Sequence, residues 1–291
     1  MFSGSYVALV TPFKNNRVDV EKLEELVEFH VNKGTSGIVP CGTTGESATL
    51  SHEEHRLVIE TVIKAVNGRV KVIAGTGSNN TTEAIELTRF AKKVKADGCL
   101  VITPYYNKPT QNGLYLHFKE ISEAVDVPIV MYNVPGRTAV NMLPSTVAKL
   151  AKIKNIVGLK EASGDITQVS QIVRDCGEDF DVLSGDDAMT FPILAVGGKG
   201  VISVVANIVP EKMANLVEAF NRKDINKARK MHLQMFPLFS AMFYETNPIP
   251  VKTAMSLMGM ISGEIRLPLC KMSEENLAKL KTTLKEYGLI S

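Results

Sequence analysis

Short apolar segments alternate with longer amphipathic segments along most of the chain. The short segments are rich in Val and Ile and end in polar residues, which is typical of buried parallel strands. The longer segments repeat their apolar residues at helical spacing, and Ser51 with Glu54 three residues later forms a capping-box pattern at the start of one of them. The expected strands are 6–10, 37–40, 70–74, 99–103, 129–133, 156–160, 181–184 and 200–204. The expected helices are 19–32, one opened by Ser51, 81–95, 111–124, one after Pro144, 166–175, 188–195 and 211–221.

Repeated βα units build either a doubly wound sheet or a closed barrel, and a count of eight units favours the barrel. After them the pattern predicts only helices, over 225–243, 251–260 and 274–287. The expected fold is therefore an α/β (β/α)8 TIM barrel over residues 1–224, followed by a C-terminal helical domain over 225–291. Several methionines in this last part recur at helical spacing, and we expect them to pack in the core rather than to bind a ligand.

Two glycine patterns fall short of nucleotide-binding motifs. Gly75-Thr76-Gly77 follows a strand, but Asn80 stands where a dinucleotide fold needs its third glycine. Gly198-Lys199 is followed by Gly200 in the place of the Ser or Thr of a phosphate loop. We therefore expect no cofactor.

Charge and cysteine content narrow the class of protein further. The 33 basic and 31 acidic residues are interspersed, and a net charge of +2 without a basic stripe makes nucleic acid an unexpected partner. The chain has no apolar run of membrane-spanning length and no basic, apolar leader at its start, so we expect no membrane contact. Its four cysteines are scattered, which argues against a disulfide framework and fits a reducing, cytoplasmic location.

Lys160 closes the expected strand 156–160. Because side chains alternate along a strand, Ile156, Gly158 and Lys160 are expected on one face, with room beside the lysine at the glycine. A lysine in an apolar pocket loses hydration, so its pKa falls and its neutral amine forms a Schiff base with a carbonyl. The alternative is a solvated lysine at a strand end, paired with Glu161.

Other polar residues follow the strands at the end where a barrel holds its active site. By the same alternation Val130 and Tyr132 face inward beside Lys160, where a phenol would serve proton transfer. Glycines at 42 and 45 flank Thr43 and Thr44, and such a turn presents backbone N–H groups to an anion. The alternative for the two threonines is a plain loop with capping hydroxyls.

The sequence resembles the dihydrodipicolinate synthase family, within the superfamily of pyruvate-dependent, Schiff-base-forming lyases and aldolases. The resemblance runs nearly end to end, and its motifs are Ala8 to Phe13, Gly42 to Ser47, Tyr132 to Thr138, Gly158 to Glu161 and Asn247 to Lys252. The second and fourth motifs also occur in sialic acid lyases and sugar-acid aldolases, so only the whole set is specific.

This resemblance implies that Lys160 condenses with pyruvate while Tyr132, Thr43 and Tyr106 relay protons. It also implies that Thr43 and Thr44 hold the pyruvate carboxylate, with Ile202 as a further substrate-binding residue. In the family the residue matching Tyr106 reaches across a subunit interface. Taken locally, Tyr105-Tyr106 is equally an aromatic pair of a core or an interface.

Arg137 distinguishes this family from its relatives. A guanidinium pairs bidentately with a carboxylate, and L-aspartate 4-semialdehyde, the second substrate implied by the resemblance, carries one. Sialate lyases usually lack arginine at the matching place. The alternative is a surface arginine in a loop.

His52 and His55 lie three residues apart on the helix opened by Ser51, hence on one face. The spacing is one residue short of a zinc-protease helix, so we expect no metal site. The plain alternative is two exposed histidines without an effector. In lysine-regulated members of the family the effector site uses residues that match Ser47, Ala48, His52, His55, Asn79, Glu83 and Tyr105.

The resemblance thus implies an enzyme that condenses pyruvate with L-aspartate 4-semialdehyde to 4-hydroxy-tetrahydrodipicolinate for diaminopimelate and lysine biosynthesis, with lysine as an inhibitor. It also implies a homotetramer built from two tight dimers, with the C-terminal helices bearing on assembly more than on chemistry. One alternative is an aldolase that cleaves a sugar-derived 2-oxo acid. Another is a non-catalytic effector-binding scaffold in which Lys160 is only ion-paired.

Overall fold

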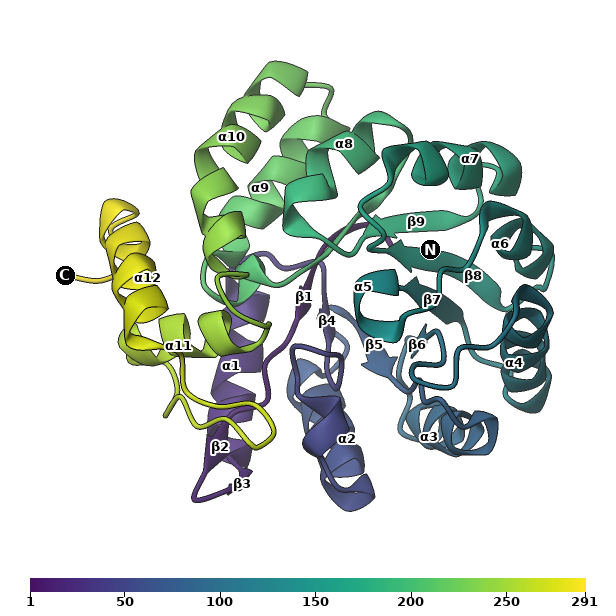
Figure 1. The fold of residues 1–291 in the computed structure, drawn as a ribbon, viewed down its shortest axis with the longest axis horizontal. Coiled ribbons are helices and arrows are strands. Elements are labelled where there is room, and N and C mark those ends of the chain that lie inside the picture. Colours follow the sequence, from purple (N-terminus) through teal and green to yellow (C-terminus); the bar gives the residue numbers. More distant parts are fainter.

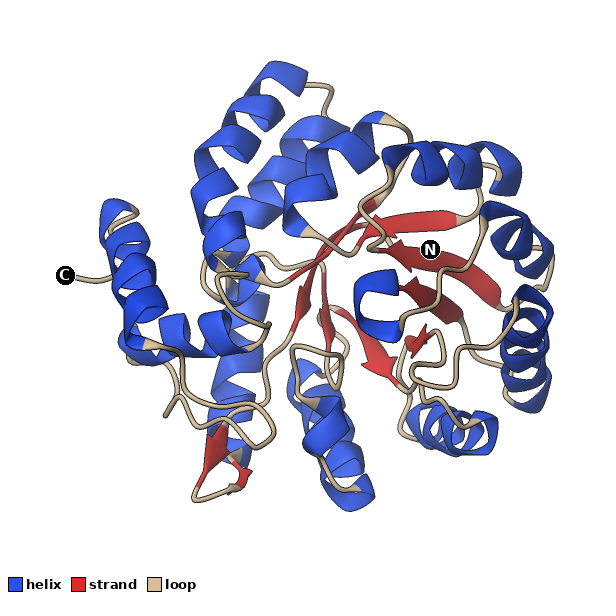
Figure 2. Ribbon diagram, viewed as in Figure 1, coloured by secondary structure: helices blue, strands red, loops and turns tan.

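Eight parallel strands form a closed barrel in the computed structural model, which describes residues 1–291. Around the barrel the strands follow the order β1-β10-β9-β8-β7-β6-β5-β4. They are β1 Gly4–Ala8, β4 Gly37–Val39, β5 Lys71–Gly75, β6 Gly98–Ile102, β7 Ile129–Asn133, β8 Ile156–Glu161, β9 Asp181–Ser184 and β10 Gly200–Ser203. Figure 2 shows these strands inside a ring of helices. The expected (β/α)8 TIM barrel is confirmed.

Helices cover the outside of the barrel and continue beyond it (Figure 1). Those between the strands are α1 Val20–Asn32, α2 His52–Val66, α3 Thr81–Lys93, α4 Gln111–Ala124, α5 Pro135–Thr138, α6 Pro144–Leu150, α7 Ile166–Cys176 and α8 Thr190–Ala195. After β10 come α9 Pro210–Asn221, α10 Ile225–Ala241, α11 Ile249–Leu257 and α12 Glu274–Glu286. Three short 3₁₀ turns complete the set: η1 Ser47–Thr49, η2 Asp187–Met189 and η3 Val205–Asn207. The capping box of Ser51 and Glu54 at the start of α2 is confirmed.

Two packed regions lie on either side of the strands. Inside the barrel, Phe2, Tyr6, Leu100, Val130 and Ile202 belong to one apolar cluster. A larger cluster fills the space between the strands and the surrounding helices and continues under α10 to α12. Side chains therefore fill the interior of the barrel.

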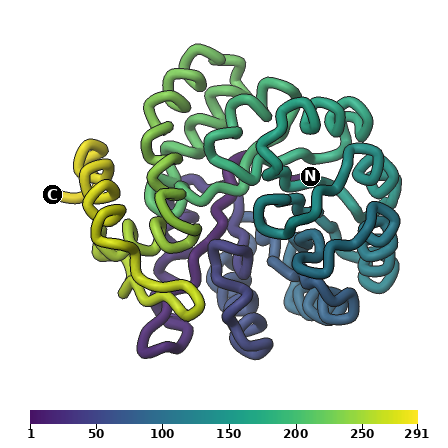
Figure 3. The backbone as a smooth tube through the Cα atoms, viewed as in Figure 1, coloured from purple at the N-terminus to yellow at the C-terminus, as the bar shows by residue number.

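The C-terminal helices lie against one side of the barrel, and the chain tube in Figure 3 runs from α9 directly into α10. Helix α10 packs on α9, and α12 packs on α10 and α11. Met235, Met242 and Met255 are buried in the larger cluster, so the prediction that the methionines pack in the core is confirmed. Helix α10 begins just after the expected domain boundary at residue 224 and packs directly on a barrel helix. The division of the chain into two domains stays a prediction. None of the helices combines the length and apolar character needed to cross a bilayer.

The structure adds a hairpin that the hydrophobic pattern did not predict. Strands β2 Phe13–Lys14 and β3 Arg17–Val18 pair antiparallel across Asn15 and Asn16, whose φ values are 52° and 58°. Asparagine tolerates this left-handed region, which two-residue hairpin turns require. The strands are too short to show alternation, so the Asn-Asn pair was the only signal.

The first strand lies earlier in the chain than expected. It spans Gly4–Ala8 rather than 6–10, because the Val10 N–H donates to the Asn207 side chain instead of extending the sheet. The expected helix 188–195 likewise begins with the 3₁₀ turn η2 before α8.

A bulge in β8 corrects the expected facing of its residues. The register between β7 and β8 shifts so that Ile129 pairs with Ile156 but Val130 pairs with Gly158. Ile156 therefore packs in the outer cluster, and the expectation that it shares a face with Lys160 is wrong. Beyond the bulge, Tyr132 pairs with Lys160, and the prediction that Val130 and Tyr132 face the barrel interior is confirmed.

Candidate active site

Lys160 and Tyr132 lie side by side at the C-terminal ends of β8 and β7. Both are buried, with 6% of each residue exposed. The Lys160 Nζ lies 4.1 Å from the centroid of the Tyr132 ring. Lys160 is thus neither solvated nor paired with Glu161, whose carboxylate bonds to Asn133 and Gln168 instead. The alternative of a solvated lysine paired with Glu161 is therefore wrong.

Burial lowers the pKa of Lys160 to about 7. The carboxylate of Asp187 opposes this shift, and the guanidinium of Arg137 adds to it. Near neutral pH a large share of Lys160 is therefore the uncharged amine, the form that attacks a carbonyl.

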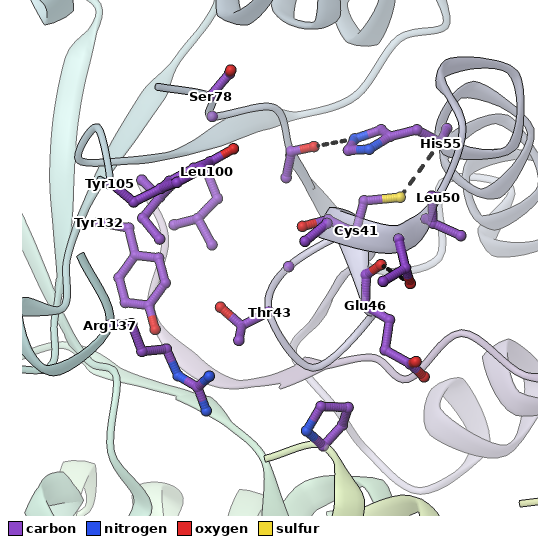
Figure 4. Close-up of a pocket in the computed structure, with 18 of the residues that line it drawn as sticks. Cys41, Thr43, Glu46, Leu50, His55, Ser78, Leu100, Tyr105, Tyr132 and Arg137 are labelled. Carbon is purple, nitrogen blue, oxygen red and sulfur yellow. Dashed lines mark hydrogen bonds between the residues drawn. The ribbon is translucent and has the colours of Figure 1, made fainter. Parts of the chain in front are cut away.

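Burial has the opposite effect on the phenol and raises the pKa of Tyr132 to about 12. The Arg137 guanidinium and the Thr43 side chain, which lies beside the phenol in Figure 4, both oppose that rise. Tyr132 consequently keeps its proton over the physiological range and is able to donate it beside the amine.

The turn after β4 forms the neighbouring wall. Thr11, after β1, donates to the Gly45 oxygen at 2.7 Å, and within the turn the Glu46 N–H donates to the Thr43 oxygen at 3.1 Å. Space around the turn is tight, because a Cβ added to Gly75 would lie 2.2 Å from the Cys41 oxygen. Thr44 is buried, whereas Thr43 is half-buried and faces the cavity.

A buried ion pair connects this turn to the C-terminal helices. Lys252, on α11, pairs with Glu46 and also donates to the Thr11 oxygen at 3.0 Å. Its Nζ lies 4.3 Å from the centroid of the Phe13 ring. Both charged side chains are almost wholly buried, so the pair fastens α11 to the turn.

Arg137 extends from α5 into the same cavity (Figure 4). Its Nη2 donates to the main-chain oxygen of Asn247 at 3.0 Å. The remaining N–H groups of the guanidinium have no bond in the structure and are available to a carboxylate.

A cavity of about 450 Å³ lies beside these groups, and Thr44 is not among its lining residues. Thr43, Tyr132 and Arg137 line its inner part. Lys160 is not in the lining and contacts the face of the Tyr132 ring, and Ile202 is wholly buried inside the barrel. Tyr106 does not line the cavity of its own chain: it is 90% exposed, with a φ of 74°.

The outer part of the cavity is lined by most residues of the expected effector set: Ser47, Ala48, His52, His55, Glu83 and Tyr105. Asn79 is not in the lining and donates to the Tyr105 oxygen at 3.2 Å. His52 Nε2 lies 3.2 Å from Glu83 Oε1.

His55 differs from the alternative of two exposed histidines, because it is buried and its Nε2 bonds to the Gly75 oxygen at 2.7 Å. Burial lowers the pKa of His55, so its ring is neutral and already bonded.

Sequence reasoning missed two groups near the site. Asn247 bonds to both Thr44 and Arg137, although the C-terminal region was expected to bear on assembly. Asp187 is a buried carboxylate whose Oδ2 accepts the N–H groups of Val204 and Val205. Asn247 stands in a motif that carried the resemblance, but its partners are far away in the sequence, so no local pattern revealed the contacts.

Comparison with known proteins places the chain among close relatives. The model of the dihydrodipicolinate synthetase family matches residues 1–287. A 4-hydroxy-tetrahydrodipicolinate synthase of Geobacter sulfurreducens is 61% identical over 290 residues, covering 100% of both chains. The crystal structure of the chloride-inhibited dihydrodipicolinate synthase from Acinetobacter baumannii, complexed with pyruvate, is 46% identical with a TM-score of 0.98 and 100% coverage of both chains. That of the synthase from Cyanidioschyzon merolae with lysine bound is 42% identical, with a TM-score of 0.97 and 99% coverage of both.

Proposed function

Because the chain belongs to the dihydrodipicolinate synthetase family, we propose that it condenses pyruvate with L-aspartate 4-semialdehyde to give 4-hydroxy-tetrahydrodipicolinate. The single observation that carries the chemistry is the buried Lys160 amine beside the Tyr132 phenol. The product would serve diaminopimelate and lysine biosynthesis.

In the first half of the reaction the neutral Lys160 amine attacks the keto carbon of pyruvate. The resulting carbinolamine loses water to form an iminium ion, and loss of a methyl proton then gives the enamine. Tyr132 supplies the proton that the departing hydroxyl needs and receives the methyl proton in turn. The burial that lowers the pKa of Lys160 supports the first step.

The pyruvate carboxylate would lie on the turn after β4. Thr43 and Thr44 would offer their hydroxyls there, together with their backbone N–H groups, which donate to no other group in the structure. Ile202, inside the barrel, would pack against the bound substrate. These groups would contact the parts of pyruvate around the keto carbon and so orient that carbon towards Lys160.

In the second half the enamine attacks the aldehyde carbon of the semialdehyde. Arg137 would pair with the substrate carboxylate through its free N–H groups. The amine of the new chain then adds to the iminium carbon, closes the ring and displaces Lys160, which regenerates the free enzyme.

Tyr106 would complete the proton relay in the active site of a second subunit. Its ring is 90% exposed in a single chain, as expected for a side chain that a neighbour covers. We therefore propose a homotetramer of two tight dimers. Light scattering would test this, since a fully active monomer would exclude the shared relay.

Free lysine would inhibit the enzyme from the outer part of the cavity. Glu83 and the Tyr105–Asn79 pair offer acceptors to its ammonium groups, and the donors of Asn79 suit its carboxylate. A relative with lysine bound supports this proposal.

An assay with two substrate pairs tests the reaction itself. Pyruvate with L-aspartate 4-semialdehyde should give the cyclic product by mass spectrometry, and Arg137→Ala should lower kcat/KM for the semialdehyde by about 10²-fold. Cleavage of a sugar-derived 2-oxo acid, unaffected by Arg137→Ala, would instead indicate an aldolase of the same superfamily.

A further inference from the structure

Asn247 lines the cavity and bonds to two of the expected substrate-binding residues, Thr44 and Arg137, which come from different parts of the barrel. It lies in the segment between α10 and α11, with 4% of the residue exposed. Its side-chain Nδ2 donates to Thr44 Oγ1 at 3.0 Å, and its main-chain oxygen accepts from Arg137 Nη2 at 3.0 Å. One residue of the C-terminal region therefore holds both Thr44 and Arg137.

The direction of the bond to Thr44 decides what the hydroxyl offers to a ligand. A hydroxyl donates one hydrogen bond and accepts two, whereas a carboxylate only accepts. Because the Asn247 amide N–H is directed at a lone pair of Thr44 Oγ1, the Thr44 proton stays free to point elsewhere. The amide of Asn247 thereby leaves the Thr44 hydroxyl able to donate its own hydrogen bond.

Packing alone does not account for an amide at this position. The Asn247 Oδ1 is buried and has no hydrogen-bond partner, which costs free energy that an apolar side chain of the same shape avoids. The segment is also fastened independently, because Lys252 on α11 pairs with Glu46 in the same turn. Compared with an apolar side chain of the same shape, the amide adds only the hydrogen bond to Thr44.

We propose that Asn247 is a positioning residue, which fixes the Thr44 hydroxyl as a donor to the pyruvate carboxylate and seats Arg137 for the second substrate. The inference rests on the proposed function, since it takes pyruvate as the ligand of Thr44. It extends that function by assigning pyruvate recognition in part to the C-terminal region of the chain.

Two variants of similar shape test the direction of the hydrogen bond. Asn247→Leu removes the donor, so KM for pyruvate should rise about 10-fold while kcat stays within about threefold. Asn247→Asp keeps the shape and is able to accept the Thr44 proton, which takes that proton from the substrate and adds a negative charge. Its KM for pyruvate should therefore rise further, by about 100-fold.

The semialdehyde supplies an internal comparison. The main-chain oxygen that holds Arg137 is present in every variant, so KM for the semialdehyde should change less than KM for pyruvate in Asn247→Leu. Ser240→Ala is the control: Ser240 is exposed near the end of α10, does not line the cavity, and its hydroxyl bonds only to the Phe236 oxygen of its own helix, so both KM values should stay unchanged.

The proposal is overturned if folded Asn247→Asp binds pyruvate as well as wild type, or if Asn247→Leu raises both KM values equally. If the Leu variant does not fold, the Asp variant decides alone, because it preserves a bond to Thr44. The proposed function fails by a different observation, namely wild-type enzyme that forms no adduct with pyruvate at Lys160.

Discussion

The Nζ of Lys160 lies over the face of the Tyr132 ring, 4.1 Å from its centroid, at the paired ends of two neighbouring strands. The same burial acts on both groups in opposite directions. It lowers the pKa of Lys160 to about 7 and raises that of Tyr132 to about 12. The pair therefore presents an unprotonated amine and a protonated phenol at one pH, the combination that imine chemistry requires.

Removing the phenol should slow turnover without disturbing the barrel. Tyr132→Phe keeps the ring that packs inside the strands but deletes the group that transfers protons, so kcat should fall on the order of 10²- to 10⁴-fold. Circular dichroism would serve as the control for folding. An unchanged kcat would assign the proton transfer to another group.

The rate of pyruvate addition should depend on the protonation of Lys160. With a pKa of about 7 for this amine, kcat/KM for pyruvate should rise with pH through about 7 and then level off, because only the neutral form attacks. Tyr132 keeps its proton up to a pKa of about 12, so it should cause no decline between pH 8 and 10. A profile without a rise between pH 6 and 8 would contradict a perturbed lysine.

Breaking the buried ion pair should destabilise the fold. Lys252→Met leaves the Glu46 carboxylate buried without its cation, and the expected loss is about 3–5 kcal/mol in the free energy of unfolding by urea titration. The double variant Glu46→Gln with Lys252→Met removes both charges and should recover part of that loss. Equal stability of the single variant and wild type would exclude a structural role for the pair.

Lysine inhibition provides a test of the outer cavity. Glu83 faces this space and lies 3.2 Å from His52, so Glu83→Ala should raise the inhibition constant of lysine about 10-fold or more. Glu86→Ala removes an exposed carboxylate from the same helix and should leave inhibition unchanged. If wild type is not inhibited at millimolar lysine, or both variants respond equally, lysine does not bind at Glu83.

The sequence was most informative where a pattern repeats. Strands such as Asp181–Ser184 and the helix Gln111–Ala124 match their predicted bounds, because both their periodicity and their ends are local features. The facing of Tyr132 also followed from alternation. The same rule failed at Ile156, since a bulge depends on the pairing of two strands and leaves no mark in either one alone.

The sequence alone did not predict the long-range contacts within the site. Asn247 and Lys252 lie more than 200 residues from their partners Thr44 and Glu46, at separations of 203 and 206. Only the folded chain brings α11 to the turn after β4. The apolar strand left a buried and a solvated Lys160 both open, and the family resemblance favoured the buried one. No local pattern predicted that His55 is buried and bonded to the Gly75 carbonyl of β5.

The central claim is that Lys160 forms the covalent bond with pyruvate, and reductive trapping tests it most directly. Enzyme treated with pyruvate and borohydride, then digested and mapped by mass spectrometry, should carry one reduced adduct on Lys160. Lys252 is a second buried lysine and should stay unlabelled, because Glu46 and the Thr11 oxygen both bind its amine. Lys160→Ala should show neither label nor turnover. Wild-type enzyme that turns over both substrates without labelling Lys160 would contradict the account.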